Sequence, residues 1–223
     1  MSLSRRALLG TGVALAVRVE AAGPEKGPGT AIAPACVDRM PEIPPERQTD
    51  AQKKASAEFL GGRGMAVFGP FVPLLRSPEV MLRVKAMGDY LRFKTSLPQK
   101  LNEFAILLTA RHWSQRYEWA IHQPLALKAG LRPEIAAAVA DGRRPARLDE
   151  TEQAVHDFVT ELLQHQSVSD TSYQAVVNHF GEQGAIDLVA VCGYYVLIAM
   201  VLNVARTALP KNAVPLEPFV CAT

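Results

Sequence analysis

The sequence predicts an all-α fold, a bundle of helices around one core. Of its 223 residues, 48% are hydrophobic and 21% are charged, which is typical of a globular chain with one well-filled core. From about residue 51 onward, apolar residues recur at three- and four-residue steps. No strand-like alternation leads into a glycine-rich phosphate loop, so a nucleotide-binding α/β fold is not expected.

The helices can be placed by their start and stop signals. Ser77 and Ser169 are N-cap candidates, and Asp149 followed by Glu152 resembles a capping box. Gly130 is a natural stop for the third helix. We therefore expect helices over about 77–93, 98–112, 115–129, 133–140, 149–165, 169–179 and 188–202.

The expected last helix is apolar on all sides. Residues 188–202 contain no charge, yet they fall short of the roughly 20 apolar residues that a bilayer span needs. We therefore expect no permanent membrane span. A helix that is apolar all round is buried in a large core or in a subunit interface. For a chain of this size an interface is the better explanation, so we predict an obligate homo-oligomer.

The N-terminal part has the features of an export signal. Arg5 and Arg6 precede a short apolar stretch, and small residues follow at Ala21 and Ala22, as in a twin-arginine signal peptide. Residues 1–22 are therefore predicted to direct the chain to the periplasm or out of the cell; a cytoplasmic leader is the alternative. Residues 23–50 are rich in proline and predict an extended connector, which leaves 51–223 as the helical domain.

Charge and cysteine content narrow the possible partners. The net charge is +2 and the basic residues are scattered, so no nucleic-acid partner is expected. Small anionic substrates remain possible, because one or two arginines can bind them. Cys192 stands in an apolar run and is predicted to be buried, whereas Cys36 and Cys221 could pair in an oxidising compartment. No CxxC motif occurs.

The candidate catalytic residues lie in the expected third helix. Glu118 and His122 are four residues apart, so a helix presents them on one face. A carboxylate beside an imidazole raises the imidazole pKa and orients the ring, which suits a proton donor near neutral pH. Tyr117 and Trp119 offer walls for a small organic ligand. His112 comes close if the preceding helix folds back.

Two other interpretations of these residues stay open. A Glu–His pair at this spacing is more often an ordinary surface pair than a catalytic one. Glu118, His122 and His112 would also make a two-histidine, one-carboxylate metal set. The chain has no HExxH motif, and we expect no bound metal.

Several ordered segments resemble the carboxymuconolactone decarboxylase-like family over about residues 60–210. They are residues 68–71, 74–79, 88–98, 103–107, 111–113 and 117–119, with His122 and Gly130. The resemblance implies an all-α fold of the carboxymuconolactone decarboxylase/alkylhydroperoxidase D-like type, assembled as trimers or hexamers through buried helices. It also implies an active site near subunit contacts, on the helix that carries Glu118 and His122.

One departure from the wider superfamily excludes a mechanism. The alkylhydroperoxidase D branch has a CxxC motif ahead of its histidine. When His122 is placed on that histidine, Gln115 and Glu118 stand where the cysteines would be. Without thiols at these positions, a dithiol peroxidase mechanism is not expected.

The resemblance implies a cofactor-independent carbon–carbon lyase acting on a small carboxylated lactone or a related aromatic-breakdown product. In that reading His122 is the proton donor, Glu118 tunes it, and His112 assists. Arg63, in the glycine-rich segment 61–64, is the candidate carboxylate anchor, and Phe71 joins the substrate-binding residues.

Two arginines outside this set, Arg92 and Arg111, are expected to be structural ion-pair partners. Two other functions stay open. One is an isomerase or another proton-transfer enzyme on the same scaffold. The other is a non-catalytic oligomeric protein that binds small molecules.

Overall fold

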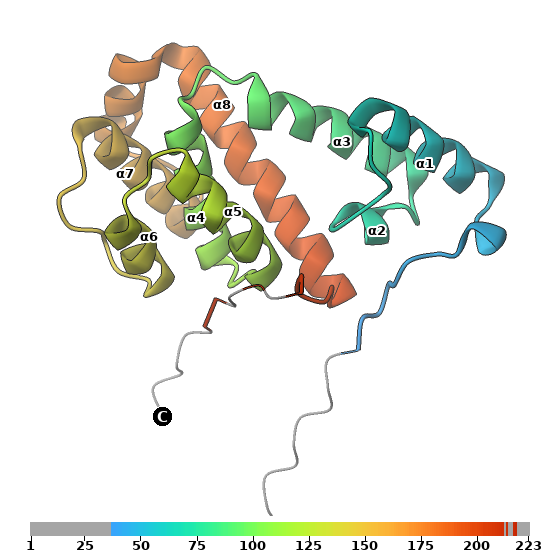
Figure 1. Ribbon diagram of the computed structural model, residues 1–223. Coiled ribbons are helices and arrows are strands. Elements are labelled where there is room, and N and C mark those ends of the chain that lie inside the picture. The colour runs from blue at the N-terminus through green and yellow to red at the C-terminus, as the bar shows by residue number, and fades with distance from the viewer. Residues whose placement is uncertain (1–36, 212, 214–215, 218–223) are drawn as a thin grey trace, which may run out of the picture. The chain divides into compact units, whose positions relative to one another are not determined.

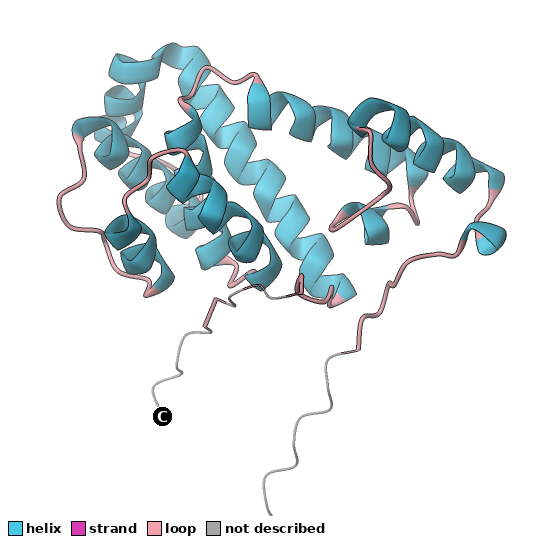
Figure 2. Cartoon of the chain, in the orientation of Figure 1, coloured by secondary structure: helices cyan, strands magenta, loops and turns pink. Residues whose placement is uncertain are grey.

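The computed structural model describes residues 37–211, 213 and 216–217, and within these residues every regular element is helical (Figures 1 and 2). This confirms the predicted all-α fold. The elements in chain order are η1 (Pro45–Arg47), α1 (Asp50–Arg63), α2 (Phe71–Leu74), α3 (Pro78–Phe93), α4 (Gln99–His112), α5 (Arg116–Lys128), α6 (Pro133–Ala140), α7 (Glu150–His165) and α8 (Asp170–Ala205).

Most helix ends fall where local sequence signals put them. Asp149 and Glu152 form a complete capping box at the start of α7, and the Ser169 side chain accepts a hydrogen bond at the start of α8. Gly130 follows α5 with a positive φ of 98°, a conformation that glycine adopts without strain. Ser77 occupies the N-cap position of α3, but its side chain makes no capping bond, which corrects that detail.

The long helix α8 is two helices joined at a bend. Gly181 has φ 69° and ψ 178°, outside the helical region, so the regular hydrogen bonding is interrupted there. The separate helices predicted over 169–179 and 188–202 therefore lie on either side of this residue. The second one begins earlier than predicted because residues 182–187 continue the helix into the core.

The core is built around α4 and α8. Helix α4 packs against α5, α6, α7 and α8, and its residues Phe104, Ile106 and Leu107 are completely buried. Helix α8 also contacts α2 and α3, so it lies between the α4–α7 group and the α1–α3 group (Figure 1). The two groups of helices thus supply opposite walls for any cavity along α8.

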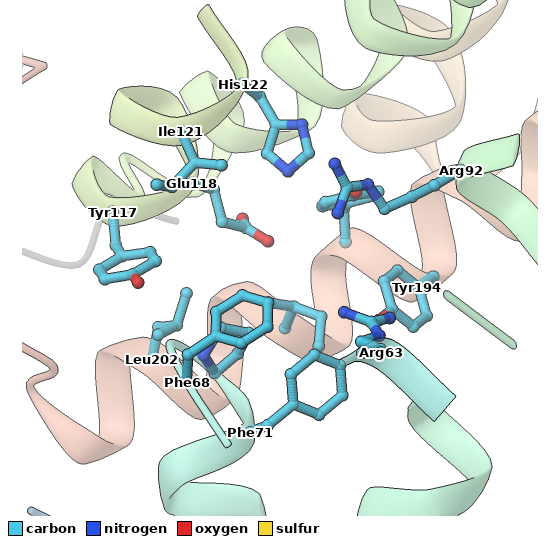
Figure 3. A pocket seen from close by; sticks show the side chains of 13 residues that line it. Arg63, Phe68, Phe71, Arg92, Tyr117, Glu118, Ile121, His122, Tyr194 and Leu202 are labelled. Carbon is cyan, nitrogen blue, oxygen red and sulfur yellow. The ribbon is translucent and has the colours of Figure 1, made fainter. Parts of the chain in front are cut away.

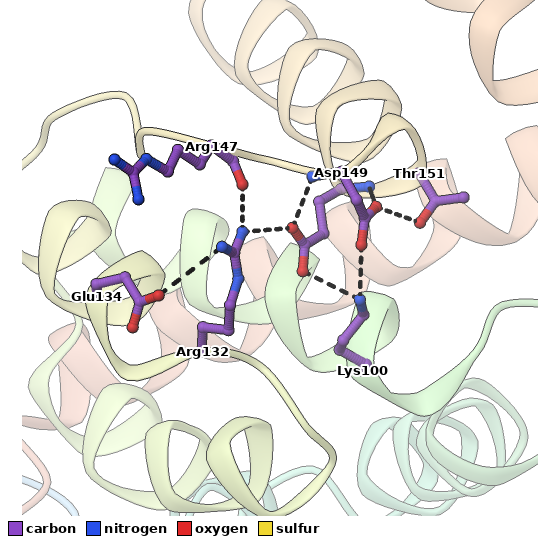
Figure 4. Close-up of polar contacts among 7 residues, drawn as sticks. Lys100, Arg132, Glu134, Arg147, Asp149 and Thr151 are labelled. Atoms are coloured by element: carbon purple, nitrogen blue, oxygen red, sulfur yellow. Dashed lines mark hydrogen bonds and ion pairs between the residues drawn. The ribbon is translucent and has the colours of Figure 1, made fainter.

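A buried ion-pair network connects α4, α7 and the loop before α6 (Figure 4). Glu152 is 2% exposed; its Oε1 lies 3.0 Å from Lys100 Nζ and its Oε2 lies 3.1 Å from Arg132 Nη2. A buried carboxylate is tolerated only when it is paired and hydrogen-bonded. This network has a structural role and stands apart from the cavity described below.

One face of α8 leaves large apolar side chains exposed. Ile186, Val189, Leu197, Met200 and Val204 follow one another at steps of three, eight, three and four residues, which places them on one face of the helix. By length and composition, α8 is the one helix among the described residues that could cross a membrane. Its opposite face is packed in the core, however, and core helices of soluble proteins meet the same criterion.

The last part of the proline-rich connector contacts the helical body. The Arg39 backbone N–H donates to Ala205 O at 2.7 Å, and Arg76 Nη2 donates to Pro41 O at 2.8 Å. Residues 37–49 therefore lie against the bundle, where the sequence predicted only an extended connector. The predicted signal segment, residues 1–22, and the cysteines Cys36 and Cys221 lie outside the described residues, whereas Cys192 is buried as expected.

Candidate active site

A pocket of about 80 Å³ lies between α5, α8 and the ends of α1–α3. A cavity of this volume has room for several water molecules. Aromatic and aliphatic side chains meet a few polar groups there, an arrangement common in small-molecule sites. Its lining residues are Arg63, Phe68, Pro70, Phe71, Arg92, Tyr117, Glu118, Ile121, His122, Tyr194, Tyr195, Ile198 and Leu202 (Figure 3).

His122 is oriented by a carboxylate from another helix. Its Nδ1 lies 2.7 Å from Oε2 of Glu103 on α4, and both residues are buried. The second oxygen of Glu103 accepts a hydrogen bond from Gln99 Nε2 at 2.9 Å. A carboxylate only accepts hydrogen bonds, so Nδ1 carries the proton and Nε2 is left for the pocket. The predicted tuning of His122 by Glu118 is therefore corrected, because Glu103 has this role.

Glu118 has the opposite environment. Its side chain points into the pocket beside His122, it is 2% exposed, and neither carboxyl oxygen has a hydrogen-bond partner (Figure 3). Burial raises the pKa of Glu118 well above its ordinary value, because an ionised carboxylate without partners would lose its hydration. The site therefore holds two buried carboxyl groups in contrasting states, one hydrogen-bonded by two donors and one bare.

Two arginines reach the pocket from α1 and α3. Arg63 is the last residue of α1, so residues 61–63 of the glycine-rich segment are helical. Arg63 Nη2 lies 2.5 Å from Asp89 Oδ1, and its guanidinium stacks 4.8 Å from the Phe71 ring centroid. Arg92 points into the pocket near His122 (Figure 3). The structural ion pair expected for Arg92 is absent among the described residues.

Two tyrosines of α8 complete the polar lining. The Tyr195 ring meets the His122 ring edge-on at 5.0 Å between centroids. Burial raises the pKa of Tyr195 well above its ordinary value and that of Tyr194 to about 12. Both hydroxyls thus stay protonated at neutral pH and can donate hydrogen bonds to an oxygen of a bound ligand.

The structure brings together five of the seven site residues predicted from the sequence. Glu118, His122, Tyr117, Arg63 and Phe71 all line the pocket.

The other two predicted residues lie elsewhere. His112 is exposed and borders a separate depression with Arg144 and His156, because the end of α4 turns this side chain away from α5. Trp119 is buried in the core and does not reach the pocket, since its neighbour Glu118 occupies the inward face of α5. The expectations that His112 assists His122 and that Trp119 binds substrate are corrected.

Four polar residues of this site, Glu103, Arg92, Tyr194 and Tyr195, were missed from the sequence, and Glu103 left a partial signal. Glu103 stands in a run with Leu101, Phe104 and Leu107, where a carboxylate must be paired if the run is buried. Arg92 left no comparable signal, because an arginine near a helix C-terminus is common.

Within the part of the chain that the structure describes, no three His, Cys, Asp or Glu side chains are grouped closely enough to hold a metal ion. The polar groups of the pocket are instead two arginines, three tyrosines, one glutamate and one histidine, and they face apolar walls. These residues are Arg63, Arg92, Tyr117, Tyr194, Tyr195, Glu118 and His122. Such a set can bind an anion, hold a developing negative charge and move a proton.

Comparison with known proteins identifies the fold. No family model and no curated protein matches the chain. Among solved structures, it is similar to the alkylhydroperoxidase AhpD core of an uncharacterized peroxidase-related protein from Ralstonia eutropha JMP134, with a TM-score of 0.60 and 17% identity. The match covers 78% of this chain and 92% of that one. The chain therefore has the AhpD-like helical fold, as the resemblance implied.

Proposed function

We propose that this protein is a cofactor-independent lyase that decarboxylates a small unsaturated lactone carrying a carboxylate. The observation that carries the proposal is that one pocket holds a buried Glu118 without hydrogen-bond partners, whose pKa burial raises, and a His122 whose Nδ1 is held by Glu103. Acid–base chemistry needs one group that keeps a proton at neutral pH and another that can accept or relay it. The AhpD-like fold includes enzymes, and Gln115 and Glu118 in place of two thiols favour proton transfer over peroxide chemistry.

The reaction can be assigned to these groups step by step. The bond between the ring carbon and the leaving carboxylate breaks, carbon dioxide departs, and the electron pair moves through the ring double bond to the lactone carbonyl oxygen. The Tyr195 hydroxyl donates a hydrogen bond to that dienolate oxygen, while His122 Nε2, which carries no proton, stays available to relay one. Glu118 then delivers its proton to carbon. The Glu118 carboxylate regains a proton from solvent or through His122, so one proton is consumed per turnover.

The neutral state of Glu118 also suits the chemistry electrostatically. An ionised Glu118 would repel the developing dienolate, whereas a carboxylic acid donates to it. Apolar residues such as Ile121, Ile198 and Leu202 cover the same space. A leaving carboxylate in apolar surroundings gains little ground-state stabilisation, which favours loss of its charge as carbon dioxide.

The test is an ultraviolet assay of the purified protein with carboxymuconolactone. We expect turnover by the wild type and losses of about a hundredfold or more in Glu118→Gln and His122→Ala, because each removes a proton-transfer group. Glu79→Gln is a matched control, since Glu79 is an exposed carboxylate whose side chain is 81% accessible. Unchanged rates in both site variants would refute the assigned roles. No turnover by the wild type would refute the named substrate and direct screening to isomerase substrates and to ligand binding.

We also propose that the chain assembles as a homotrimer or homohexamer through the exposed apolar face of α8. The support is the row Ile186, Val189, Leu197, Met200 and Val204, because soluble monomers rarely leave such contiguous apolar faces exposed. Light scattering of the wild type and of Leu197→Glu tests this. A wild-type monomer at micromolar concentration would refute the assembly, and a membrane-bound wild type would indicate a span.

Export through residues 1–22, to the periplasm or beyond, is likewise our proposal. It rests on the paired arginines Arg5 and Arg6 ahead of an apolar stretch. Fractionation of the native host tests it. Recovery of the full-length chain in the cytosol alone would overturn it.

A further inference from the structure

We propose that Arg92, and not Arg63, binds a carboxylate that the substrate keeps through the reaction, so that the pocket selects small ring compounds with one such anionic group. The inference rests on the proposed function for the reaction, but recognition of a carboxylate can be measured without turnover. Arg92 thereby replaces Arg63, which the sequence analysis had named as the candidate carboxylate anchor.

The guanidinium of Arg63 is already engaged in an ion pair within the protein. Its guanidinium pairs with Asp89, which also accepts from Lys85 Nζ at 2.8 Å, and it stacks on Phe71. An Asp89 shared by two cations, with a pKa held below its usual range, stays ionised at neutral pH. To bind a substrate carboxylate, Arg63 would have to give up or share this geometry. Its contacts therefore describe a structural residue at the pocket wall.

Arg92 differs in having no acidic partner among the described residues. Its Nε, like that of Arg63, is buried without a hydrogen-bond acceptor, but the Arg92 guanidinium also makes no other hydrogen bond or ion pair with a described residue and lies 5.1 Å from the Phe93 ring centroid. The N–H donors of the Arg92 guanidinium are therefore available to a ligand. A carboxylate has two acceptor oxygens at the spacing of two guanidinium N–H groups, so the two can form a bidentate pair.

The other buried carboxyl groups form no ion pair with Arg92. Glu103 accepts from His122 and Gln99, and Asp187 accepts from the Ser96 backbone N–H and hydroxyl at 2.8 and 2.9 Å. Glu118 is held in its neutral form by burial. Arg92 therefore brings to the pocket a guanidinium that makes no ion pair with any described residue.

A second, open depression adjoins the pocket at the same residues. Arg63, Phe68 and Arg92 line both hollows, and the outer one adds Lys94 and Phe93. Asp89 is the single acidic residue of this outer lining. An approaching anion thus meets a basic mouth and reaches Arg92 before Glu118, and such a field raises the local concentration of anions.

The geometry also orients the ligand. Arg92 enters the pocket from the α3 side, while Glu118 projects from α5 on the other side (Figure 3). A flat ring whose retained carboxylate pairs with Arg92 would place its opposite edge toward Glu118 and His122. The apolar residues Phe71 and Ile198 would flank the ring.

Isothermal titration calorimetry with 2-furoate and its neutral analogue 2-furamide tests the inference. We expect the wild type to bind the carboxylate at least about tenfold more tightly than the amide, because a bidentate charge-assisted pair forms only with the former. Arg92→Met should lose this preference. Arg63→Met, a matched control at the other arginine of the pocket lining, should retain it. Arg92→Lys keeps the positive charge but loses the bidentate guanidinium, so it should retain part of the preference for the carboxylate. This variant replaces Arg92→Met in the test if the Met variant does not fold.

Three outcomes overturn the inference: equal affinity of the wild type for both ligands, retention of the preference in Arg92→Met, or its loss in Arg63→Met alone. Turnover of carboxymuconolactone is measured on the same preparations. Selective binding through Arg92 without turnover would leave the anchor standing and refute the proposed reaction. Turnover with an unchanged KM in Arg92→Met would support the proposed reaction and refute Arg92 as the carboxylate anchor.

Discussion

Replacing Glu118 with glutamine should change how the stability of the protein depends on pH. Glu118 is 2% exposed and neither of its oxygens is hydrogen-bonded, so the folded state keeps the carboxyl protonated above the ordinary glutamate pKa of 4.5. Glutamine has nearly the same shape and no ionisable proton. The variant therefore isolates the contribution of this one titration.

The sign and size of the effect follow from the raised pKa of Glu118. Below pH 4.5 the carboxyl is neutral in the folded and unfolded states, and its titration costs nothing. Above that pH the unfolded state releases the proton while the folded state retains it, so the free energy of unfolding falls. The decrease is about 1.4 kcal/mol for each pH unit until the folded-state pKa is reached. Glu118→Gln should not show this decrease.

Urea denaturation at pH 5, 6 and 7, at one protein concentration, gives the free energy of unfolding of both proteins. We expect the difference between wild type and Glu118→Gln to shift by about 1 kcal/mol or more from pH 5 to 6, with the wild type losing stability. Glu79→Gln, at an exposed site, should show no such shift. A difference that is constant across the three pH values would refute the assignment of a protonated Glu118.

Three further predictions concern the surrounding structure. A Cβ added at Gly88 would lie 2.8 Å from Cζ of Tyr194, so Gly88→Ala should lower the melting temperature by about 2–4 °C, and an unchanged melt would contradict this packing. Glu152→Ala removes a capping box and two ion pairs, so urea denaturation should show a loss of about 2 kcal/mol, and a smaller loss in Glu152→Gln. Burial raises the pKa of the Cys192 thiol to about 12, so peptide mapping after iodoacetamide treatment should find it alkylated only in denatured protein; labelling in the native state would show that it is accessible.

The helical architecture could be predicted from the sequence because its signals are local. The capping box at Asp149 and Glu152 and the stop at Gly130 depend on residues within one turn of each other. The shared face of Glu118 and His122 follows from their four-residue spacing, and both side chains do line one pocket. The predicted direct pairing of Glu118 with His122 is absent from the structure, because i,i+4 neighbours on a helix can each turn toward a different partner.

The partners of these groups were decided by tertiary packing alone. Glu103 reaches His122 across nineteen residues because α4 and α5 pack together, and no local pattern specifies which side of α4 meets the imidazole. The packing of α4 against α5 also decided that the His112 side chain points away from the pocket. The sequence by itself determined the helices from residue 77 onward, apart from residues 182–187, and the common face of Glu118 and His122. Only the tertiary structure decided that Glu118 is bare, that Glu103 holds His122 and that Arg92 lacks an acidic partner, since desolvation and pairing depend on neighbours distant in the chain.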